Sequence, residues 1–424
     1  MAIDVQRDYQ RWIDFAETTN IVITHVIETH MHNDYLTGGY QLAKTIGATY
    51  IIPSNSGIEF EAKELKDNEV FKTGSIVVKG LHTPGHTEHH MSYLIEDGQT
   101  SSVFTGGSIL YGTVGRTDLL GDNKTNLLTN AQYESAQHLG QMLNDSVAVY
   151  PTHGFGSFCS STGGSGQNSS TIAVEKKINI AFTAKSKQEF VNQIIAGLGP
   201  YPAYYAHMGK MNQLGPIPVT QLHIHDYSID EISKRLSQVN SWVVDIRERK
   251  LFAAHHPAGS VGFELGNVFA TYAGWIIPWS DQILLAGGSE QDLLKAYIEL
   301  SRIGLDKFVH GATSNQQLYF SAGPSASYQV ADFNDLKQQI DKKPFVLDVR
   351  LESEWIDRHI PNSINIPLYQ VLERLDEIPA DKQIWVHCAS GYRASIAASL
   401  LDKMNRKPIL INSDFHQAVE LDLC

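Results

Sequence analysis

The chain has 424 residues, of which 42% are hydrophobic and 19% are charged, a composition typical of globular proteins with several domains. Its formal net charge of −13 argues against a nucleic-acid or anionic-membrane partner, because a surface that binds phosphates normally makes the charge balance basic. The sequence lacks an apolar run of about 18 residues, and no basic segment followed by an apolar run stands at its start, so we expect a cytoplasmic protein without a membrane span.

The first 218 residues alternate β-branched runs with helical segments, which indicates a layered α/β domain. The pattern predicts strands at residues 21–26, 49–52, 75–79, 101–104 and 147–150, and helices at residues 39–46 and 131–143. Residues 154–170 are rich in glycine and serine and are predicted to form a loop. Because the predicted strands end in loops that carry histidine or glycine, we expect the chemistry of this domain at the strand ends.

Three histidine motifs follow predicted strands. T-H-M-H-N-D contains His30, His32 and Asp34, T-P-G-H contains His86, and P-T-H-G contains His153. Loops at neighbouring strand ends can converge, and imidazole and carboxylate groups suit Zn²⁺ or Fe(II). A single histidine is more often an ordinary core or surface residue, but the motifs together predict a metal site.

The second half of the chain contains an internal repeat. Aligning residues 243–263 with residues 346–366 pairs Asp245 with Asp348, Arg247 with Arg350, Phe252 with Trp355, His256 with His359, and Ser260 with Ser363. Each copy opens with an apolar run that ends in Asp-x-Arg, as expected of a buried parallel strand with a polar loop at its carboxyl end. With helices predicted at residues 229–239, 290–303 and 333–342, we expect two doubly wound α/β domains, bounded by residues 209–218 and 321–327.

The three cysteines, Cys159, Cys388 and Cys424, are too few and too scattered for a disulfide framework. Cys388 follows a predicted buried strand at residues 384–387 and precedes a predicted helix at residues 394–401. Backbone N–H groups and the helix N-terminus therefore surround its sulfur and stabilise a thiolate or persulfide anion. Arg393 adds positive charge, and the loop between the two residues is formed by Ala389, Ser390, Gly391 and Tyr392. The alternative is that Cys388 is a buried core thiol.

The histidine motifs, with F-T-G-x-x-x-x-x-x-V-G-R-T-D at residues 104–118, resemble those of the metallo-β-lactamase superfamily in its glyoxalase II and persulfide dioxygenase branch. The four residues between Cys388 and Arg393 resemble the loop of rhodaneses. Together these features make essentially the whole chain similar to bacterial persulfide dioxygenase–rhodanese fusions. The resemblance implies an αββα sandwich at residues 1–218, a cysteine-less pseudo-rhodanese domain at 219–322 and a rhodanese domain at 323–424. The hairpin that precedes the I-D-x-x-R-D segment in this family is expected to be missing.

The resemblance also implies a role in sulfide and persulfide metabolism. Fe(II), or alternatively zinc, would be held by His30, by His86 and by an aspartate, with His32, Asp34 and His153 as further candidates. Cys388 would transfer sulfur between a low-molecular-weight thiol persulfide and thiosulfate or sulfite. We expect a homo-oligomer, and we expect the cysteine-less copy to be a spacer or docking domain without which the last domain still transfers sulfur.

Two positions depart from the family pattern. Gly107 stands where the aspartate ligand belongs, and Tyr35 stands where the hydrolase branch has a further histidine. We therefore expect weak metal binding through His30, His32 and His86, with Glu88 as a substitute carboxylate, and stronger binding in Gly107→Asp. Two alternatives remain at this point: a glyoxalase II-type thioester hydrolase, and a non-catalytic metallo-β-lactamase scaffold that serves the rhodanese domain.

Overall fold

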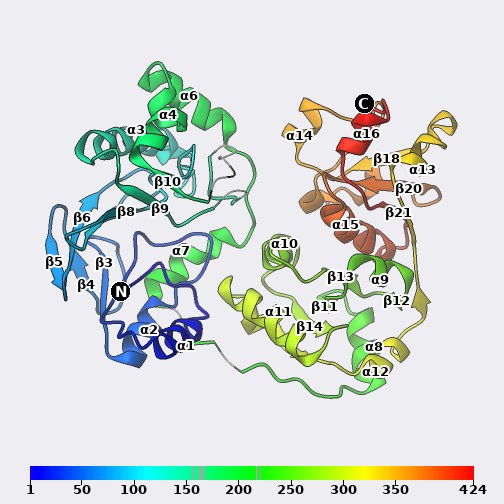
Figure 1. The fold of residues 1–424 in the computed structure, drawn as a ribbon. Coiled ribbons are helices and arrows are strands. Elements are labelled where there is room, and N and C mark those ends of the chain that lie inside the picture. Colours follow the sequence, from blue (N-terminus) through cyan, green and yellow to red (C-terminus); the bar gives the residue numbers. More distant parts are fainter. Residues whose placement is uncertain (155–156, 162–165, 167, 216–217, 220) are drawn as a thin grey trace. The chain divides into compact units, whose positions relative to one another are not determined.

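The computed structural model describes residues 1–154, 157–161, 166, 168–215, 218–219 and 221–424 (Figure 1). The chain divides into two compact units. The N-terminal unit comprises Met1–Val219 and Arg302–Gly304, and the C-terminal unit comprises Thr220–Ser301 and Leu305–Cys424.

The N-terminal unit contains two sheets. The first has four parallel strands in the order β1-β2-β3-β4, with bounds Ala2–Ile3, His25–Ile27, Thr49–Pro53 and Lys63–Leu65. The second has the order β10-β9-β8-β7-β6-β5, and β5 to β10 span Val70–Thr73, Ile76–His82, Met91–Glu96, Ser101–Gly106, Ala148–Pro151 and Ser170–Thr171. Neighbours in this second sheet are antiparallel except β8 and β9, which run parallel.

Helices cover the outer faces of the two sheets. Ile27 and Ile51 of the first sheet share a buried cluster with Val78, Met91 and Tyr93 of the second, so the inner faces pack on each other. Helices α1 (Gln10–Thr18) and α2 (Gly39–Ile46) cover the first sheet. The outer face of the second sheet is covered by α3 (Asp122–Met142), α4 (Ile172–Ile178), α5 (Ile180–Thr183) and α6 (Lys187–Gly197). The predicted αββα sandwich is confirmed.

Some predicted boundaries in this unit are wrong. The strand expected at residues 21–26 begins only at His25, because Ile21 and Val22 are 51% and 80% exposed and no neighbouring strand pairs with them. Helix α7 (Tyr205–Leu214) runs into the boundary expected at residues 209–218, of which residues 216–217 lie outside the described residues. The glycine- and serine-rich loop at residues 154–170 also lies partly outside the described residues.

The C-terminal unit contains two parallel sheets with related strand orders. The first is β13-β11-β14-β15, with β11 (Ser241–Asp245), β13 (Val261–Gly262), β14 (Gln282–Ala286) and β15 (Val309–Ala312). The second is β17-β21-β20-β18-β19, with β17 (Gln329–Ala331), β18 (Phe345–Asp348), β19 (Ile364–Asn365), β20 (Gln383–His387) and β21 (Lys407–Ile411). In both, the chain order reverses beside the strand that ends in Asp-x-Arg, so both are doubly wound as predicted.

Helices and short strands complete this unit. The first copy contains α8 (Ile229–Ser237), α9 (Arg249–Ala254), α10 (Phe269–Ile276), α11 (Glu290–Arg302) and α12 (Gln316–Ser321). The second contains α13 (Phe333–Lys337), α14 (Glu352–Asp357), α15 (Tyr392–Lys403) and α16 (His416–Glu420). Strands β12 (His256–Pro257) and β16 (Ser325–Ala326) pair with each other outside both sheets, so the boundary expected at residues 321–327 is partly a strand.

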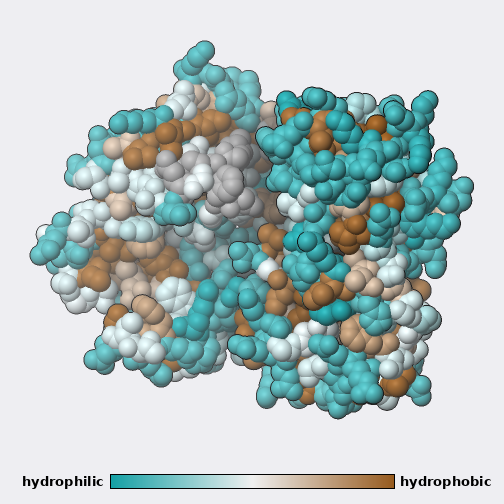
Figure 2. Space-filling view, turned by 45° about the vertical axis from the view of Figure 1, so that its right-hand side comes forward, coloured by the Kyte–Doolittle hydropathy of each residue, from teal (hydrophilic) through white to brown (hydrophobic). Residues whose placement is uncertain are grey.

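Hydrophilic residues cover most of the face shown in Figure 2, and hydrophobic residues lie between them in smaller patches. Among the described residues, no helix has both the length and the apolar character needed to cross a membrane.

The residues paired by the internal repeat make equivalent contacts. The Nδ1 atoms of His256 and His359 each lie 2.8 Å from the carbonyl oxygen of the residue four positions earlier. Each imidazole also stacks on an aromatic ring, that of Phe252 at 4.0 Å and that of Trp355 at 3.9 Å between centroids. The sequence repeat therefore corresponds to the same side-chain contacts in both copies.

The Asp-x-Arg pairs have a structural role. Arg350 Nη2 lies 2.6 Å from Asp348 Oδ2 and also donates to the Arg358 carbonyl oxygen at 2.7 Å. Arg247 binds Asp245 and the His255 carbonyl oxygen in the same way. In each copy the arginine therefore ties the end of a buried strand to the segment that follows it.

Arg350→Ala is expected to lower the free energy of unfolding of the C-terminal unit by about 3–5 kcal/mol. The variant leaves the Asp348 carboxylate, which is fully buried, without its cation. Urea titration of the full chain followed by circular dichroism measures the effect. Arg374→Ala is the control, because Arg374 and Glu377 form an exposed pair that contributes about 1 kcal/mol or less. Equal losses in both variants would contradict the structural role.

Candidate functional site

Three histidine side chains converge inside the N-terminal unit. His30 follows β2, His86 lies in the turn after β6, and His153 follows β9. All three are buried, and one ring nitrogen of each lies within 4.8 Å of those of the other two. The structure thus brings together three of the predicted candidates, from three strand ends.

Hydrogen bonds to Nδ1 fix the orientation of two of these rings. His86 Nδ1 lies 2.7 Å from the Arg116 carbonyl oxygen, which can only accept, so the proton is on Nδ1. His153 Nδ1 lies 3.3 Å from Asp34 Oδ2, a second pure acceptor. Both rings therefore turn the lone pair of Nε2 towards the centre of the cluster. Asp34 acts as an outer partner that orients His153.

The third ring is fixed through a hydroxyl group. Thr29 Oγ1 donates to Asp4 Oδ2 at 2.9 Å and lies 2.8 Å from His30 Nδ1, so it accepts the proton of that nitrogen. Burial, together with the neighbouring imidazoles, lowers the pKa of His30 well below its usual value and the pKa of His86 to about 4. These two rings are therefore neutral near pH 7.

The Nε2 atoms of His30, His86 and His153 are buried and have no hydrogen-bond partner among the residues that the structure describes. Buried polar atoms without a partner are costly unless something binds them. Three histidine nitrogens within 4.8 Å of one another suit Zn²⁺ or Fe(II), each with further coordination positions left open for a substrate. The residues present fit a metal ion.

His32 does not belong to this set. Its Nε2 lies 3.3 Å from Asp4 Oδ1, 3.2 Å from Glu28 Oε2 and 3.0 Å from the Tyr35 hydroxyl. Burial alone would lower the pKa of His32, but the two carboxylates outweigh it and raise the pKa to about 10. A protonated imidazole held by two carboxylates does not bind a metal through the same nitrogen. The structure groups His153, rather than His32, with His30 and His86, and His32 as a ligand stays a prediction.

Gly107 leaves no room for the missing aspartate. A Cβ atom on Gly107 would lie 2.4 Å from His86 Cδ2, so a side chain there would push His86 out of the cluster. The expectation that Gly107→Asp restores a ligand is therefore wrong for this arrangement. Glu88, expected as a substitute, forms an ion pair of 2.8 Å with Lys124 on the surface instead.

Two more residues adjoin the cluster. His90, four residues after His86, is fully buried and its Nε2 accepts from the Gly107 N–H at 2.9 Å. The sequence reasoning missed it, although the density of histidines in H-T-E-H-H was a signal. Cys159 is also buried, and its sulfur, a carboxylate oxygen of Asp34 and a ring nitrogen of His153 lie within 4.8 Å of one another. Cys159 thus lies beside His153 and Asp34.

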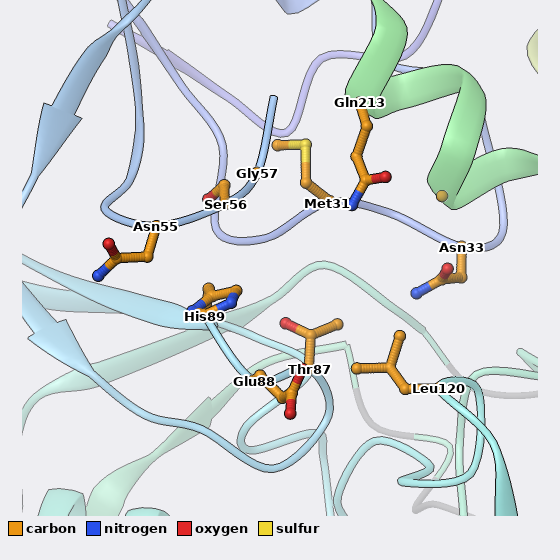
Figure 3. A pocket seen from close by; sticks show the side chains of 11 residues that line it. Met31, Asn33, Asn55, Ser56, Gly57, Thr87, Glu88, His89, Leu120 and Gln213 are labelled. Carbon is orange, nitrogen blue, oxygen red and sulfur yellow. The ribbon is translucent and has the colours of Figure 1, made fainter. Parts of the chain in front are cut away.

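A small pocket adjoins the loops that carry the cluster (Figure 3). Met31 lies between His30 and His32 in sequence, and Thr87 follows His86. Met31 and Gln213 face Thr87 and Glu88 across the pocket, whose volume is about 170 Å³. The other residues that line the pocket are Asn33, Asn55, Ser56, Gly57, His89, Leu120 and Gly209. This volume is enough for a small part of a ligand.

The predicted cysteine loop lies between β20 and α15. Cys388 directly follows β20 and is 1% exposed, and helix α15 begins at Tyr392, two residues earlier than predicted. The Gly391 N–H donates to Cys388 Sγ at 3.2 Å. Gly391 has φ +89°, and a Cβ atom there would lie 2.3 Å from Asn412 Oδ1, so both conformation and space require glycine. Ala389 and Ser390 complete the loop.

Arg393 lies at the end of this loop, but it is not a free charge. Its two terminal nitrogens lie 2.5 and 2.8 Å from the carboxylate oxygens of Glu354 on α14. Burial would raise the pKa of Glu354, but the hydrogen bonds from Arg393 outweigh it and lower that pKa. The expected positive charge beside Cys388 is therefore shared with a carboxylate that no sequence motif indicated.

The first copy has glycine at the position that Cys388 occupies in the second copy. Gly287 follows β14 as Cys388 follows β20, and no cysteine occurs between residues 219 and 323. A Cβ atom on Gly287, which has φ +86°, would lie 2.1 Å from Asp245 Oδ1. The first copy therefore has no thiol at this position, and its failure to carry sulfur stays a prediction.

Known proteins are similar to both ends of the chain. Residues 3–154 match the metallo-beta-lactamase superfamily and residues 332–418 match the rhodanese-like domain. Hydroxyacylglutathione hydrolase of Dictyostelium discoideum is 36% identical over 141 residues, which are 32% of this chain and half of that enzyme. The probable polyketide biosynthesis zinc-dependent hydrolase BaeB of Bacillus velezensis is 26% identical over 45% of this chain and 80% of its own length. The solved metallo-beta-lactamase of Staphylococcus aureus subsp. aureus COL is 27% identical with a TM-score of 0.64, covering 73% of this chain and 90% of that one. The chain thus joins an N-terminal metallo-β-lactamase domain to a C-terminal rhodanese-like domain.

Proposed function

We propose that this chain is a sulfurtransferase of persulfide metabolism that carries sulfur on Cys388, fused to a metal-dependent domain that acts as a persulfide dioxygenase on a low-molecular-weight thiol persulfide. The observation that carries the proposal is the enclosure of one sulfur atom by the loop of residues 388–393, with the Gly391 N–H donating to it. A hydrogen bond from the backbone stabilises an anionic sulfur more than a neutral one.

The sulfur transfer needs no cofactor. The Cys388 thiolate attacks the outer sulfur of thiosulfate, the S–S bond of thiosulfate breaks, and sulfite leaves with the electron pair. The persulfide formed on Cys388 then passes its outer sulfur to an acceptor thiolate. In both steps the Gly391 N–H, which donates to Cys388 Sγ, stabilises the negative charge on this sulfur. Arg393, paired with Glu354, stands at the end of the same loop.

The histidine cluster supports the second half of the proposal. A metal held by His30, His86 and His153 would supply the Lewis-acid and redox chemistry that the reaction of a persulfide with O₂ requires. The chain itself keeps the three Nε2 atoms free, because Thr29, Arg116 and Asp34 accept the protons on the Nδ1 atoms. The three Nε2 atoms are buried without a partner among the described residues, an arrangement that suits a metal site better than a non-catalytic scaffold.

A dinuclear hydrolase is the less favoured reading. Curated relatives of the first domain are hydrolases, and one of them is 36% identical. However, His32 is engaged by Asp4, Glu28 and Tyr35, and Gly107 offers no carboxylate to bridge two metals. The three-histidine cluster therefore lacks the bridging carboxylate of a dinuclear site, although His153 also lies in a second group of potential ligands with Asp34 and Cys159.

In the iron-loaded full chain we expect consumption of O₂ and release of sulfite with glutathione persulfide, and no hydrolysis of S-lactoylglutathione above the level of chelator-treated protein. An oxygen electrode and a thioester absorbance assay measure the two reactions. Chelator-treated protein is also the control for O₂ consumption. Thioester hydrolysis by the zinc-loaded chain without any persulfide-dependent O₂ consumption would replace this proposal with the hydrolase.

A further inference from the structure

The cysteine-less copy reaches the loop that carries Cys388. Within the C-terminal unit, helix α15 contacts α9 and β13 of the first copy (Figure 1). Arg249 is the first residue of α9, and its Nη1 donates to the Ser390 carbonyl oxygen at 3.4 Å and to Asn412 Oδ1 at 3.5 Å. A residue of the copy without a cysteine thus binds the backbone of the sulfur-carrying loop.

Further contacts hold Arg249 in place. Its Nε forms an ion pair with the Glu264 carboxylate, and its guanidinium lies 5.3 Å from the centre of the Tyr392 ring. The Tyr392 hydroxyl in turn donates to the Glu264 carbonyl oxygen at 2.7 Å. Tyr272 of α10 lies beside the same ring, with 5.7 Å between centroids. These contacts join the two copies around residues 390–392.

The peptide bond that Arg249 binds is the one that serves the sulfur. The Ser390 carbonyl and the Gly391 N–H belong to one planar trans peptide unit, so they point in opposite directions. Arg249 binds the carbonyl end and Cys388 Sγ accepts from the N–H end. A cation at the carbonyl therefore fixes the rotation of the peptide and polarises its N–H towards the sulfur.

We propose that Arg249 is a positioning residue of the Cys388 site, which acts through the Ser390–Gly391 peptide, and that the cysteine-less copy is a required part of the sulfurtransferase rather than a spacer. The inference rests on the proposed function of Cys388. It also replaces the expectation that the last domain transfers sulfur normally when residues 219–322 are deleted.

The test uses full-length Arg249→Ala, Arg249→Lys and the control Lys250→Ala, which removes an exposed cation of the same helix. With thiosulfate as sulfur donor, Arg249→Ala is expected to lower kcat about tenfold or more and to leave KM within about twofold, because Arg249 touches the loop backbone and not the donor. Arg249→Lys keeps the charge and should recover part of the loss. Lys250→Ala should match the wild type in both constants.

A second measurement does not depend on sulfur chemistry. Amide hydrogen exchange in the segment of residues 388–393 should be faster in Arg249→Ala than in the wild type and Lys250→Ala, with unchanged exchange in the strands β18 and β20. Unchanged kcat and unchanged exchange in both Arg249 variants would overturn the inference while leaving the proposed function intact. If wild-type protein takes up no sulfur, the proposed function fails, and the exchange measurement alone decides whether Arg249 orders the loop.

Discussion

Cys388→Ser is expected to abolish the addition of one sulfur atom that intact-mass measurement should detect on the wild-type chain after incubation with thiosulfate. A serine hydroxyl has nearly the same shape, but it is not ionised near neutral pH and does not form a persulfide. Because Cys388 is 1% exposed and accepts the Gly391 N–H, the loss would come from the nucleophile and not from a collapsed loop. Cys159→Ser and Cys424→Ser are the matched controls and should still gain one sulfur.

Arg393→Ala extends the same experiment. The variant keeps the thiol but leaves the Glu354 carboxylate without its partner, close to the point where an anionic donor must approach. We expect sulfur loading slower by about tenfold or more, since an unpaired, partly buried charge repels thiosulfate. If the added sulfur persists in Cys388→Ser, or if Cys388 of the folded wild type resists both thiosulfate and iodoacetamide, the sulfurtransferase assignment is wrong.

The parts of the molecule that depend on neighbouring residues in sequence could be predicted. The strand, loop and helix around Cys388 follow from an apolar run, a glycine that must adopt positive φ, and a helical segment that begins at once. The two Asp-x-Arg pairs could be aligned with each other from the sequence, because in each copy the arginine binds an aspartate only two residues away. Such short-range patterns can be predicted because the residues that make the contacts are neighbours in the sequence.

The choice among histidines could not be made from the sequence. His30 and His32 lie two residues apart on one loop, and their roles differ because of residues elsewhere in the fold. Asp4 and Glu28 turn His32 into a cation, whereas Asp34 aims His153 at His30. Sequence spacing shows which side chains can reach a site, but the charge state that decides between them is set by burial and by distant partners.

Contacts between the two copies were equally hidden. Arg249 and Ser390 are far apart in the chain, and nothing in the two motifs that contain them indicated that they are in contact. The same limitation explains residues 21–24, whose β-branched composition suggested a strand although Val22 is largely exposed. Composition indicates what a segment can form, and the neighbours that the fold brings to it decide the outcome.

His153→Ala is expected to lower the affinity of the N-terminal unit for zinc or cobalt by about 100-fold or more, whereas the wild-type chain should bind one ion. The variant removes one of three convergent Nε2 atoms, and neither Gly107 nor Glu88 offers a carboxylate in its place. Titration of full-length, metal-free protein with Co²⁺, followed by its d–d absorption, measures affinity and reports the geometry of the ligands without reference to any activity.

Two matched variants make this test specific for the three-histidine set. His89→Ala removes an exposed imidazole that lines the neighbouring pocket and should leave Co²⁺ affinity unchanged. His32→Gln keeps hydrogen bonds to Asp4 and Glu28, so it should keep most of the Co²⁺ affinity even if the unit is less stable, because His32 is held by these carboxylates. Loss of the ion in His32→Gln together with its retention in His153→Ala would show that the ligands are His30, His32 and His86. In that case His32 would bind the metal through Nδ1, which is buried and has no hydrogen-bond partner among the described residues, while its Nε2 stays with Asp4 and Glu28.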